Sequence, residues 1–70
     1  MQEIQRHLGA RIRRLRAKRG WSQEFAAVSG LHRTYIGAVE RGEKNLTIAT
    51  MLTLAKTLDT TIARLFQGIA

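Results

Sequence analysis

The stretch Ala26–Glu40, AAVSGLHRTYIGAVE, decides the fold of this chain. Gly30 lies in its first third, and glycine adopts the left-handed conformation that ends many helices without the penalty of a Cβ atom. A second helix is expected to begin directly afterwards, with His32 as a weak N-cap. Ile36 and Val39 then recur three residues apart on one face of that helix. We therefore predict two short helices joined by a sharp turn.

Two helices joined by a three- to four-residue turn that contains glycine form a helix-turn-helix, whose second helix can lie in the major groove of DNA. The residues of this unit resemble the helix-turn-helix of phage-repressor and Cro-type regulators, the xenobiotic-response-element family. The resembling positions are Ala26, Gly30, Leu31, Ile36 and Val39, followed by Glu40-Arg41-Gly42. The resemblance covers residues 8–66 and implies a compact, all-α, five-helix, lambda-repressor-like domain with its helix-turn-helix over about residues 22–40.

One spacing departs from the family pattern. The family usually has one residue step more than the six steps found here between Gly20, which ends the first helix, and the small Ala26. The phosphate-binding glutamine of the family therefore falls on Ser22 when counted back from Ala26, and on Gln23 when read by residue type. We predict that Gln23 has this role.

Composition favours one small helical domain over residues 1–70. The chain is 44% hydrophobic and 24% charged, which indicates a folded protein, and it contains no proline. A 70-residue chain has room for only a modest core, so self-association is favoured. The absence of cysteine excludes disulfides. The start of the chain lacks the apolar core of a signal peptide, and no apolar run is as long as a membrane span, so we expect a cytoplasmic protein.

The net charge of +7 indicates an anionic partner. Seven cations lie near or within the first helix, predicted over about Ile4 to Lys18. Gly9 is expected to weaken this helix, so that its ordered part begins near Leu8. The apolar stripe of the helix consists of Ile4, Leu8, Ile12 and Leu15. A basic amphipathic helix can also lie on a membrane, but this stripe is thin and lacks an aromatic residue.

Four further helices are predicted. Ser22 is expected to cap the second, over about Ser22–Ser29, and the third spans about His32–Glu40. Thr47 is expected to cap the fourth, and Thr61 a short fifth. The apolar stripe of the fourth helix is expected to contain Ile48, Met51, Leu52, Ala55 and Leu58, with Leu54 to one side; the fifth holds Ile62, Leu65 and Phe66.

Catalytic groups are not assembled in this sequence. His7 and His32 lie on different predicted helices, and no acidic residue or cysteine stands at a ligand spacing to either. No nucleophile is paired with a base, and no glycine-rich phosphate loop is present. We therefore expect neither an enzyme nor a metal or cofactor site.

The resemblance implies a set of DNA contacts. Counting from Gly30, the base-reading positions are Arg33, Thr34, Gly37 and Ala38. Arg33 has the donors for guanine, although it could instead hold a phosphate. The phosphate contacts are expected at Gln23, His32, Tyr35, Lys44 and Asn45, with Arg11 and Arg14 adding to the positive field.

Two further contacts are expected. The resemblance implies an ion pair between Arg16 and Glu40, which either is partly buried or lies on the surface. The apolar residues at the end of the chain are expected to form a homodimer interface, unless they fold back onto the first and fourth helices, which is the stronger alternative for Leu65. These residues are Ile62, Leu65, Phe66 and Ile69.

The leading hypothesis is a transcriptional regulator that binds a partly palindromic double-stranded DNA operator as a homodimer, as a repressor or an activator. Family members of this length include controller proteins of restriction-modification systems, phage regulators and antitoxins. The alternative is an adaptor that uses the same fold to bind a protein, against which the basic third helix argues. RNA binding lacks an aromatic stacking platform.

Overall fold

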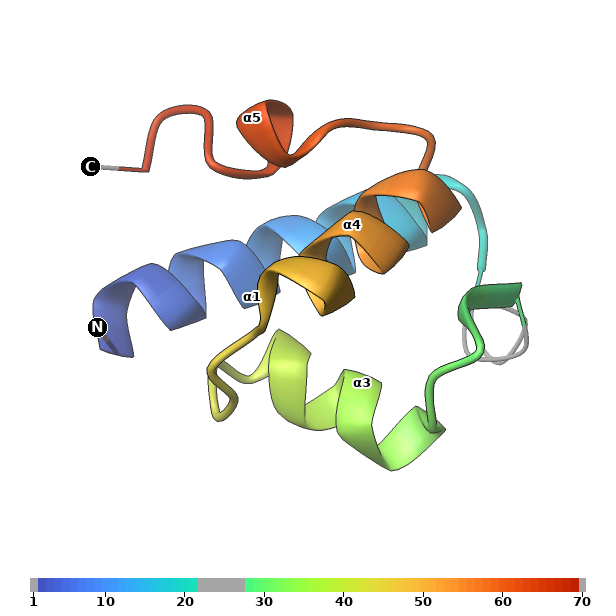
Figure 1. Cartoon of the computed structure of the whole chain (residues 1–70), viewed down its shortest axis with the longest axis horizontal. Coiled ribbons are helices and arrows are strands. Elements are labelled where there is room, and N and C mark those ends of the chain that lie inside the picture. Colours follow the sequence, from blue (N-terminus) through green and yellow to red (C-terminus); the bar gives the residue numbers. More distant parts are fainter. Residues whose placement is uncertain (1, 22–27, 70) are drawn as a thin grey trace.

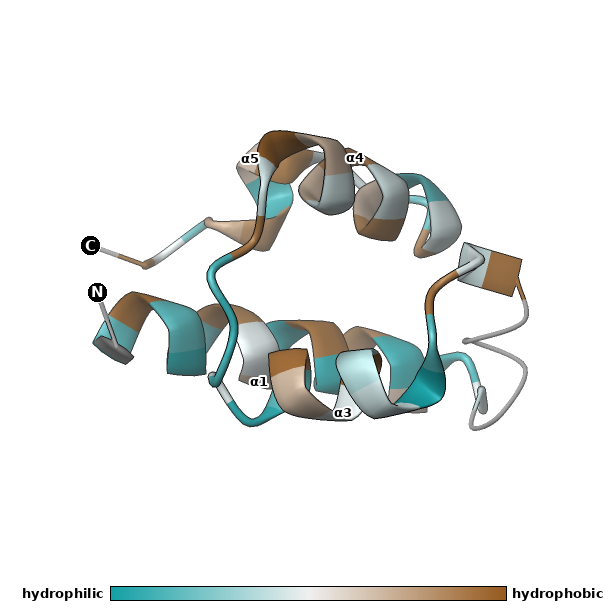
Figure 2. Cartoon of the chain, turned by 60° about the horizontal axis from the view of Figure 1, so that its bottom comes forward, coloured by the Kyte–Doolittle hydropathy of each residue, from teal (hydrophilic) through white to brown (hydrophobic). Residues whose placement is uncertain are grey.

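The structure of the chain is a computed structural model that describes residues 2–21 and 28–69. Over these residues it contains helices and no strand, so the all-α prediction is confirmed. The helices are α1 (Gln2–Lys18), α3 (Arg33–Glu40), α4 (Ile48–Thr57) and α5 (Ile62–Leu65). Figure 1 shows α1 running the length of the molecule between α3 and α5. In Figure 2, α1 and α3 form one layer, and α4 and α5 form the other.

The predicted second helix lies mainly outside the described residues. Its last two residues, Val28 and Ser29, are helical. Ser22, Gln23 and Ala26 belong to the part of the chain that is not described, so the expectations placed on them remain predictions.

The core lies between the two layers and takes side chains from each of the four described helices. Ile12, Leu54 and Leu65 are its most completely buried large side chains. The cluster consists of Leu8 and Ile12 from α1, Ile36 and Val39 from α3, Leu54, Ala55 and Leu58 from α4, and Leu65 from α5. Leu8 and Ile12 of α1 and Ile36 and Val39 of α3 therefore face the core as expected, because they recur at the helical period, and Leu15 packs against them. Ile4, which was also expected in the stripe, is partly buried but lies outside the core cluster.

The stripe predicted for α4 was partly wrong. Ile48 and Leu52 are 69% and 47% exposed, whereas Leu54, which was expected beside the stripe, is 1% exposed. The buried face is centred on Leu54, Ala55 and Leu58, which are spaced by one residue and then by three. Ile48 is the first residue of the helix and lies toward one edge of that face. Ile48 and Leu52 therefore leave apolar surface open to solvent.

The start of α1 also differs from the prediction. We expected Gly9 to leave the helix frayed before Leu8, but α1 is continuous from Gln2 to Lys18. The reason is tertiary, because α1 crosses the end of α3 at this glycine. A Cβ atom at Gly9 would overlap the carbonyl oxygen of Val39 and lie 2.8 Å from that of Glu40.

A second glycine completes this crossing. Gly42, directly after α3, has a φ of +77°, and a Cβ atom there would lie 2.8 Å from the Cα atom of Arg6. The two elements thus approach closely at both glycines, against the carbonyls of Val39 and Glu40 at Gly9 and against the main chain and Cγ of Arg6 at Gly42. This contact holds α3 in place beneath α1.

The helix ends follow the predicted signals. The amides of Gly42 and Glu43 donate to the carbonyls of Val39 and Ala38, which closes α3 with a glycine C-cap motif. Thr47 Oγ1 accepts from the amide of Thr50 at the start of α4. Thr61 Oγ1 caps α5 in the same way through the amide of Arg64.

Arg11 joins α1 to the end of the chain. Its guanidinium donates to the carbonyl oxygens of Arg64 and Gln67, each at 2.7 Å. Arg14 lines a surface hollow with Thr60 and Gln67 on the same side. Both arginines therefore lie against the α5 side of α1, and their contribution to the positive field at the DNA contacts remains a prediction. Among the described helices, none is long and apolar enough to cross a membrane.

Candidate nucleic-acid interface

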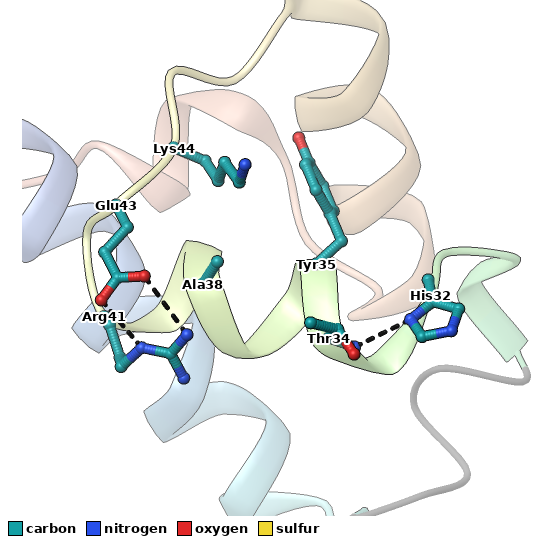
Figure 3. Close-up of a pocket in the computed structure, with 7 residues that line it drawn as sticks. All are labelled: His32, Thr34, Tyr35, Ala38, Arg41, Glu43 and Lys44. Atoms are coloured by element: carbon teal, nitrogen blue, oxygen red, sulfur yellow. Dashed lines mark hydrogen bonds and ion pairs between the residues drawn. The ribbon is translucent and has the colours of Figure 1, made fainter.

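The outward face of α3 forms one side of an open groove of about 530 Å³. Figure 3 shows His32 and Thr34 at one end of this groove and Arg41 with Glu43 at the other, while Tyr35 and Lys44 stand along its length. The full lining is His32, Thr34, Tyr35, Ala38, Arg41, Glu43 and Lys44. The structure therefore brings together five of the residues expected at the DNA contacts and adds two that were not expected.

The helical period explains which side chains reach the groove. Ile36 and Val39 point into the core, so positions 34, 37, 38 and 41 turn outward. Thr34 is exposed, and Ala38 forms the floor of the groove at 7% exposure, outside the core cluster. Of the four expected base contacts, Ala38 is therefore the most covered.

Arg33 and Gly37 adjoin this groove without lining it. Arg33 is the exposed first residue of α3, at the edge of the outward face. Gly37 is partly buried, and the Nη1 atom of Arg41 lies 3.2 Å from the position that a Cβ atom at Gly37 would take. The side chain of Arg41 thus lies back along the helix, over the glycine.

His32 caps α3, as predicted. Its Nδ1 atom accepts a hydrogen bond of 3.1 Å from the amide of Thr34. A neutral imidazole that accepts at Nδ1 carries its proton on Nε2, so this residue keeps one donor for an anion. The capping hydrogen bond therefore leaves the second ring nitrogen of His32 available to a ligand.

The loop after α3 carries the two remaining described phosphate candidates. Lys44 and Asn45 are both exposed. The side-chain amide of Gln5 in α1 donates to Oδ1 of Asn45. That bond occupies the oxygen of Asn45 and leaves its NH₂ group as the donor for a phosphate. Gln23 lies outside the described residues.

Arg41 and Glu43 line the groove although sequence reasoning gave them no role there. Nε and Nη2 of Arg41 donate to the two carboxylate oxygens of Glu43 at 2.9 and 3.2 Å. This hydrogen-bonded pair raises the pKa of Arg41 and lowers the pKa of Glu43. The signal was available in part, because position 41 follows Thr34 by seven residues and Gly37 by four, which places all three on one helical face.

The structure also brings Arg16 and Glu40 together behind α3. Nε and Nη2 of Arg16 donate to the two oxygens of Glu40 at 2.7 and 3.0 Å. The side chains are 20% and 10% exposed, so the pair is largely covered. The hydrogen bond to Glu40 is the main cause that raises the pKa of Arg16, which keeps the guanidinium charged.

The residues expected at a dimer interface divide into two groups. Leu65 is completely buried inside the protomer, so its assignment to an interface was wrong. It points inward because α5 folds back onto α1 and α4, which was the alternative left open for this residue. Ile62, Phe66 and Ile69 remain partly accessible.

Both the sequence and the fold of this chain match known proteins. A match to the Helix-turn-helix family covers residues 12–65, from the middle of α1 to the end of α5. The chain belongs to the helix-turn-helix family. It is therefore a DNA-binding transcription regulator and not an enzyme, and the lambda-repressor-like fold is confirmed.

Three relatives show how closely this helix-turn-helix protein resembles others. It is 47% identical to Control protein C.SmaI of Serratia marcescens, over 96% of this chain and 83% of that protein. It is 34% identical to Control protein C.MunI of a Mycoplasma species, over 99% of this chain and 96% of that protein. The crystal structure of the restriction-modification controller protein C.AhdI from Aeromonas hydrophila superposes with a TM-score of 0.81 at 45% identity, covering 87% of this chain and 94% of that one.

Proposed function

We propose that this helix-turn-helix protein recognises a specific, partly palindromic DNA operator as a homodimer. The observation that carries the proposal is the exposed first turn of α3. Arg33 and Thr34 are free of the core, while Ile36 and Val39 hold the opposite face of the helix in place. A helix held in this way can enter the major groove, with its first turn directed at base edges.

The base contacts follow from the chemistry of that surface. The guanidinium of Arg33 can donate two hydrogen bonds to O6 and N7 of guanine, and Thr34 can contact a thymine methyl group or donate one hydrogen bond. Gly37 and Ala38 have little or no side chain, so they let the DNA approach α3.

The phosphate contacts lie on both sides of these residues. His32 keeps an Nε2 donor, and Tyr35 and Lys44 stand along the groove. Asn45 keeps its NH₂ group, and Gln23 is proposed from its residue type alone. Contacts of this kind fix the position of a protein on the duplex without reading its sequence.

The homodimer would form through apolar surface that the protomer leaves open. Ile62, Phe66 and Ile69 are partly accessible. Ile48 and Leu52 of α4 are exposed, and Met51 between them shares an apolar pocket with Phe66. A two-fold contact over this surface would bury the same patch from both copies, and two recognition helices about 34 Å apart would reach half-sites about ten base pairs apart.

The similarity to C.SmaI, C.MunI and C.AhdI supports a more specific role. These relatives are control or controller proteins, and the match to each covers most of both chains. We propose that this chain is likewise the controller of a restriction-modification system. Whether it represses or activates depends on where its operator lies relative to the promoter.

Selection from a pool of randomised duplexes tests this function. Wild-type protein should enrich a motif with two related half-sites, and a mobility shift on that motif should resist competition by random DNA and by RNA. The motif should occur upstream of restriction-modification genes in the source genome. Enrichment of no motif, or equal binding to RNA, would refute sequence-specific operator binding, and a motif found only elsewhere would refute the controller role.

A further inference from the structure

Arg41 and Glu43 together form the most distinctive charged feature of the groove. The groove contains one carboxylate, from Glu43, among the cations that line it in the described part of the chain. A carboxylate next to DNA repels phosphate, so its presence at a DNA-binding surface calls for a compensating role. Its bidentate contact with Arg41 indicates what that role is.

The donor pattern of Arg41 is divided between two edges of its guanidinium. Arginine has five N–H donors in a fixed plane. Glu43 takes one from Nε and one from Nη2. The edge formed by Nη1 and the second hydrogen of Nη2 keeps its donors, and Nη1 lies over Gly37 on the outward face of α3.

We propose that Arg41 reads a guanine through this remaining edge, and that Glu43 is the positioning residue that holds the guanidinium in the orientation required. This inference rests on the proposed binding of DNA by α3 and adds a specificity-determining residue to it. The pair of donors on Nη1 and Nη2 matches O6 and N7 of guanine in the major groove.

Three features of the structure support this arrangement. Arg41 follows Thr34 by seven residues and so lies on the same helical face, at the opposite end of the groove from Thr34 and next to Gly37. Gly37 has no side chain to displace the guanidinium. The pair also raises the pKa of Arg41 and lowers that of Glu43, so both groups stay charged at neutral pH.

The test compares the base preferences of Arg41→Lys, Arg41→Ala and Glu43→Gln with those of wild type, using the selected operator and random duplex of the same length. Lys56→Ala, which removes an exposed cation from α4, is the control for the loss of one charge. Both side chains of the pair are more than half exposed, so the variants should fold, which melting curves would check.

Arg41→Lys keeps the charge but not the planar fork. It should lose roughly 5- to 100-fold of discrimination at one guanine in each half-site and bind random DNA nearly as well as wild type. Glu43→Gln should weaken the same preference by a smaller factor while it increases binding to random DNA, because a negative charge is removed. Loss of a group that only stabilised the fold would not lower the base preference and raise the affinity for random DNA at the same time.

A measurement without DNA tests the pair itself. In an NMR titration, the pKa of the Glu43 carboxyl should be lower than that of an ordinary glutamate, and it should return to the ordinary range in Arg41→Ala. An ordinary value in wild type would overturn the positioning role.

The remaining outcomes decide the base-reading role. If Arg41→Ala weakens operator and random DNA by the same factor, Arg41 contacts a phosphate; if its base preferences equal those of wild type, it contacts no base. Either result overturns the inference while the proposed function stands. If wild type itself shows no preferred sequence, the proposed function fails first.

Discussion

The guanidinium of Arg16, in the last turn of α1, donates to both carboxylate oxygens of Glu40, the last residue of α3. Its third nitrogen, Nη1, donates to the carbonyl oxygen of Trp21 at 2.8 Å. The side chain of Arg16 therefore links the end of α1, the segment at Trp21 that follows it, and the end of α3. Because the pair is largely covered, either partner alone would be a poorly solvated charge.

Replacing Glu40 by alanine should destabilise the protein by roughly 3 kcal/mol, because Arg16 would remain partly buried without its carboxylate. The double variant Arg16→Met/Glu40→Leu should recover much of this loss. Thermal melting of the two variants beside wild type measures the difference. A Glu40→Ala curve that overlays wild type would show that the pair contributes nothing.

Gly9→Ala should destabilise the protein by about 1–3 kcal/mol, since the new methyl group would meet the carbonyls at the end of α3. Helix propensity alone predicts the opposite sign, a gain of about 1 kcal/mol. Ala10→Gly, at the exposed neighbouring position, is the matched control and should cost about 1 kcal/mol. Denaturant unfolding measures both changes, and a stabilised Gly9→Ala would contradict the crossing described above.

Arg33→Ala should lower the preference for one base pair in each half-site by about 1–3 kcal/mol, because guanine would lose a bidentate partner. Binding to random DNA should fall far less. Mobility shifts on the operator and on random duplex give the two affinities. Equal losses on both would assign Arg33 to a phosphate.

Lys44→Met should weaken binding to all sequences alike and lower the slope of log K against log salt by about one, as expected for one lost phosphate contact. Titrations at several salt concentrations provide the slope. The exposed Lys18, at the far end of α1, offers a control in Lys18→Met. A slope unchanged by Lys44→Met would remove this residue from the interface.

Ile69→Asp should convert a dimer into a folded monomer, because it places a charge in the proposed apolar contact. Phe66→Asp should break the same contact and also lower stability, because Phe66 packs against the core. Leu65→Ala should instead lower stability by about 2–5 kcal/mol, since that side chain belongs to the core. Sedimentation beside thermal melting separates the two effects. A wild type that stays monomeric at high micromolar concentration would rule out the dimer.

Local chemistry made the helix ends predictable. Gly42 and Thr47 act within a few residues of their own positions, and they end α3 and start α4 as the sequence indicates. The core positions of α3 were predictable for a similar reason, because a single buried face repeats at the helical period. These are properties that one short segment carries by itself.

The errors arose where a residue depends on distant neighbours. Gly9 was judged by helix propensity, although its role is to let α3 approach. Ile48 and Leu52 fit an apolar stripe, but none of the described helices covers them, and both are exposed. Arg41 follows the helical period of α3, but its partner Glu43 lies beyond the helix, where that period does not place a side chain.

The contact between α1 and α3 through main-chain atoms at Gly9 and Gly42 has a consequence for how such regulators diverge. Because α3 docks through the close approaches at Gly9 and Gly42 and through the core residues Ile36 and Val39, exposed residues of its outward face such as Thr34 contribute little to holding the helix. They are free to change during evolution without tilting it. On the proposed base contacts, exchanging a few of these surface residues should change the operator, and a laboratory transplant of the outward face from a relative should carry over the relative's target sequence.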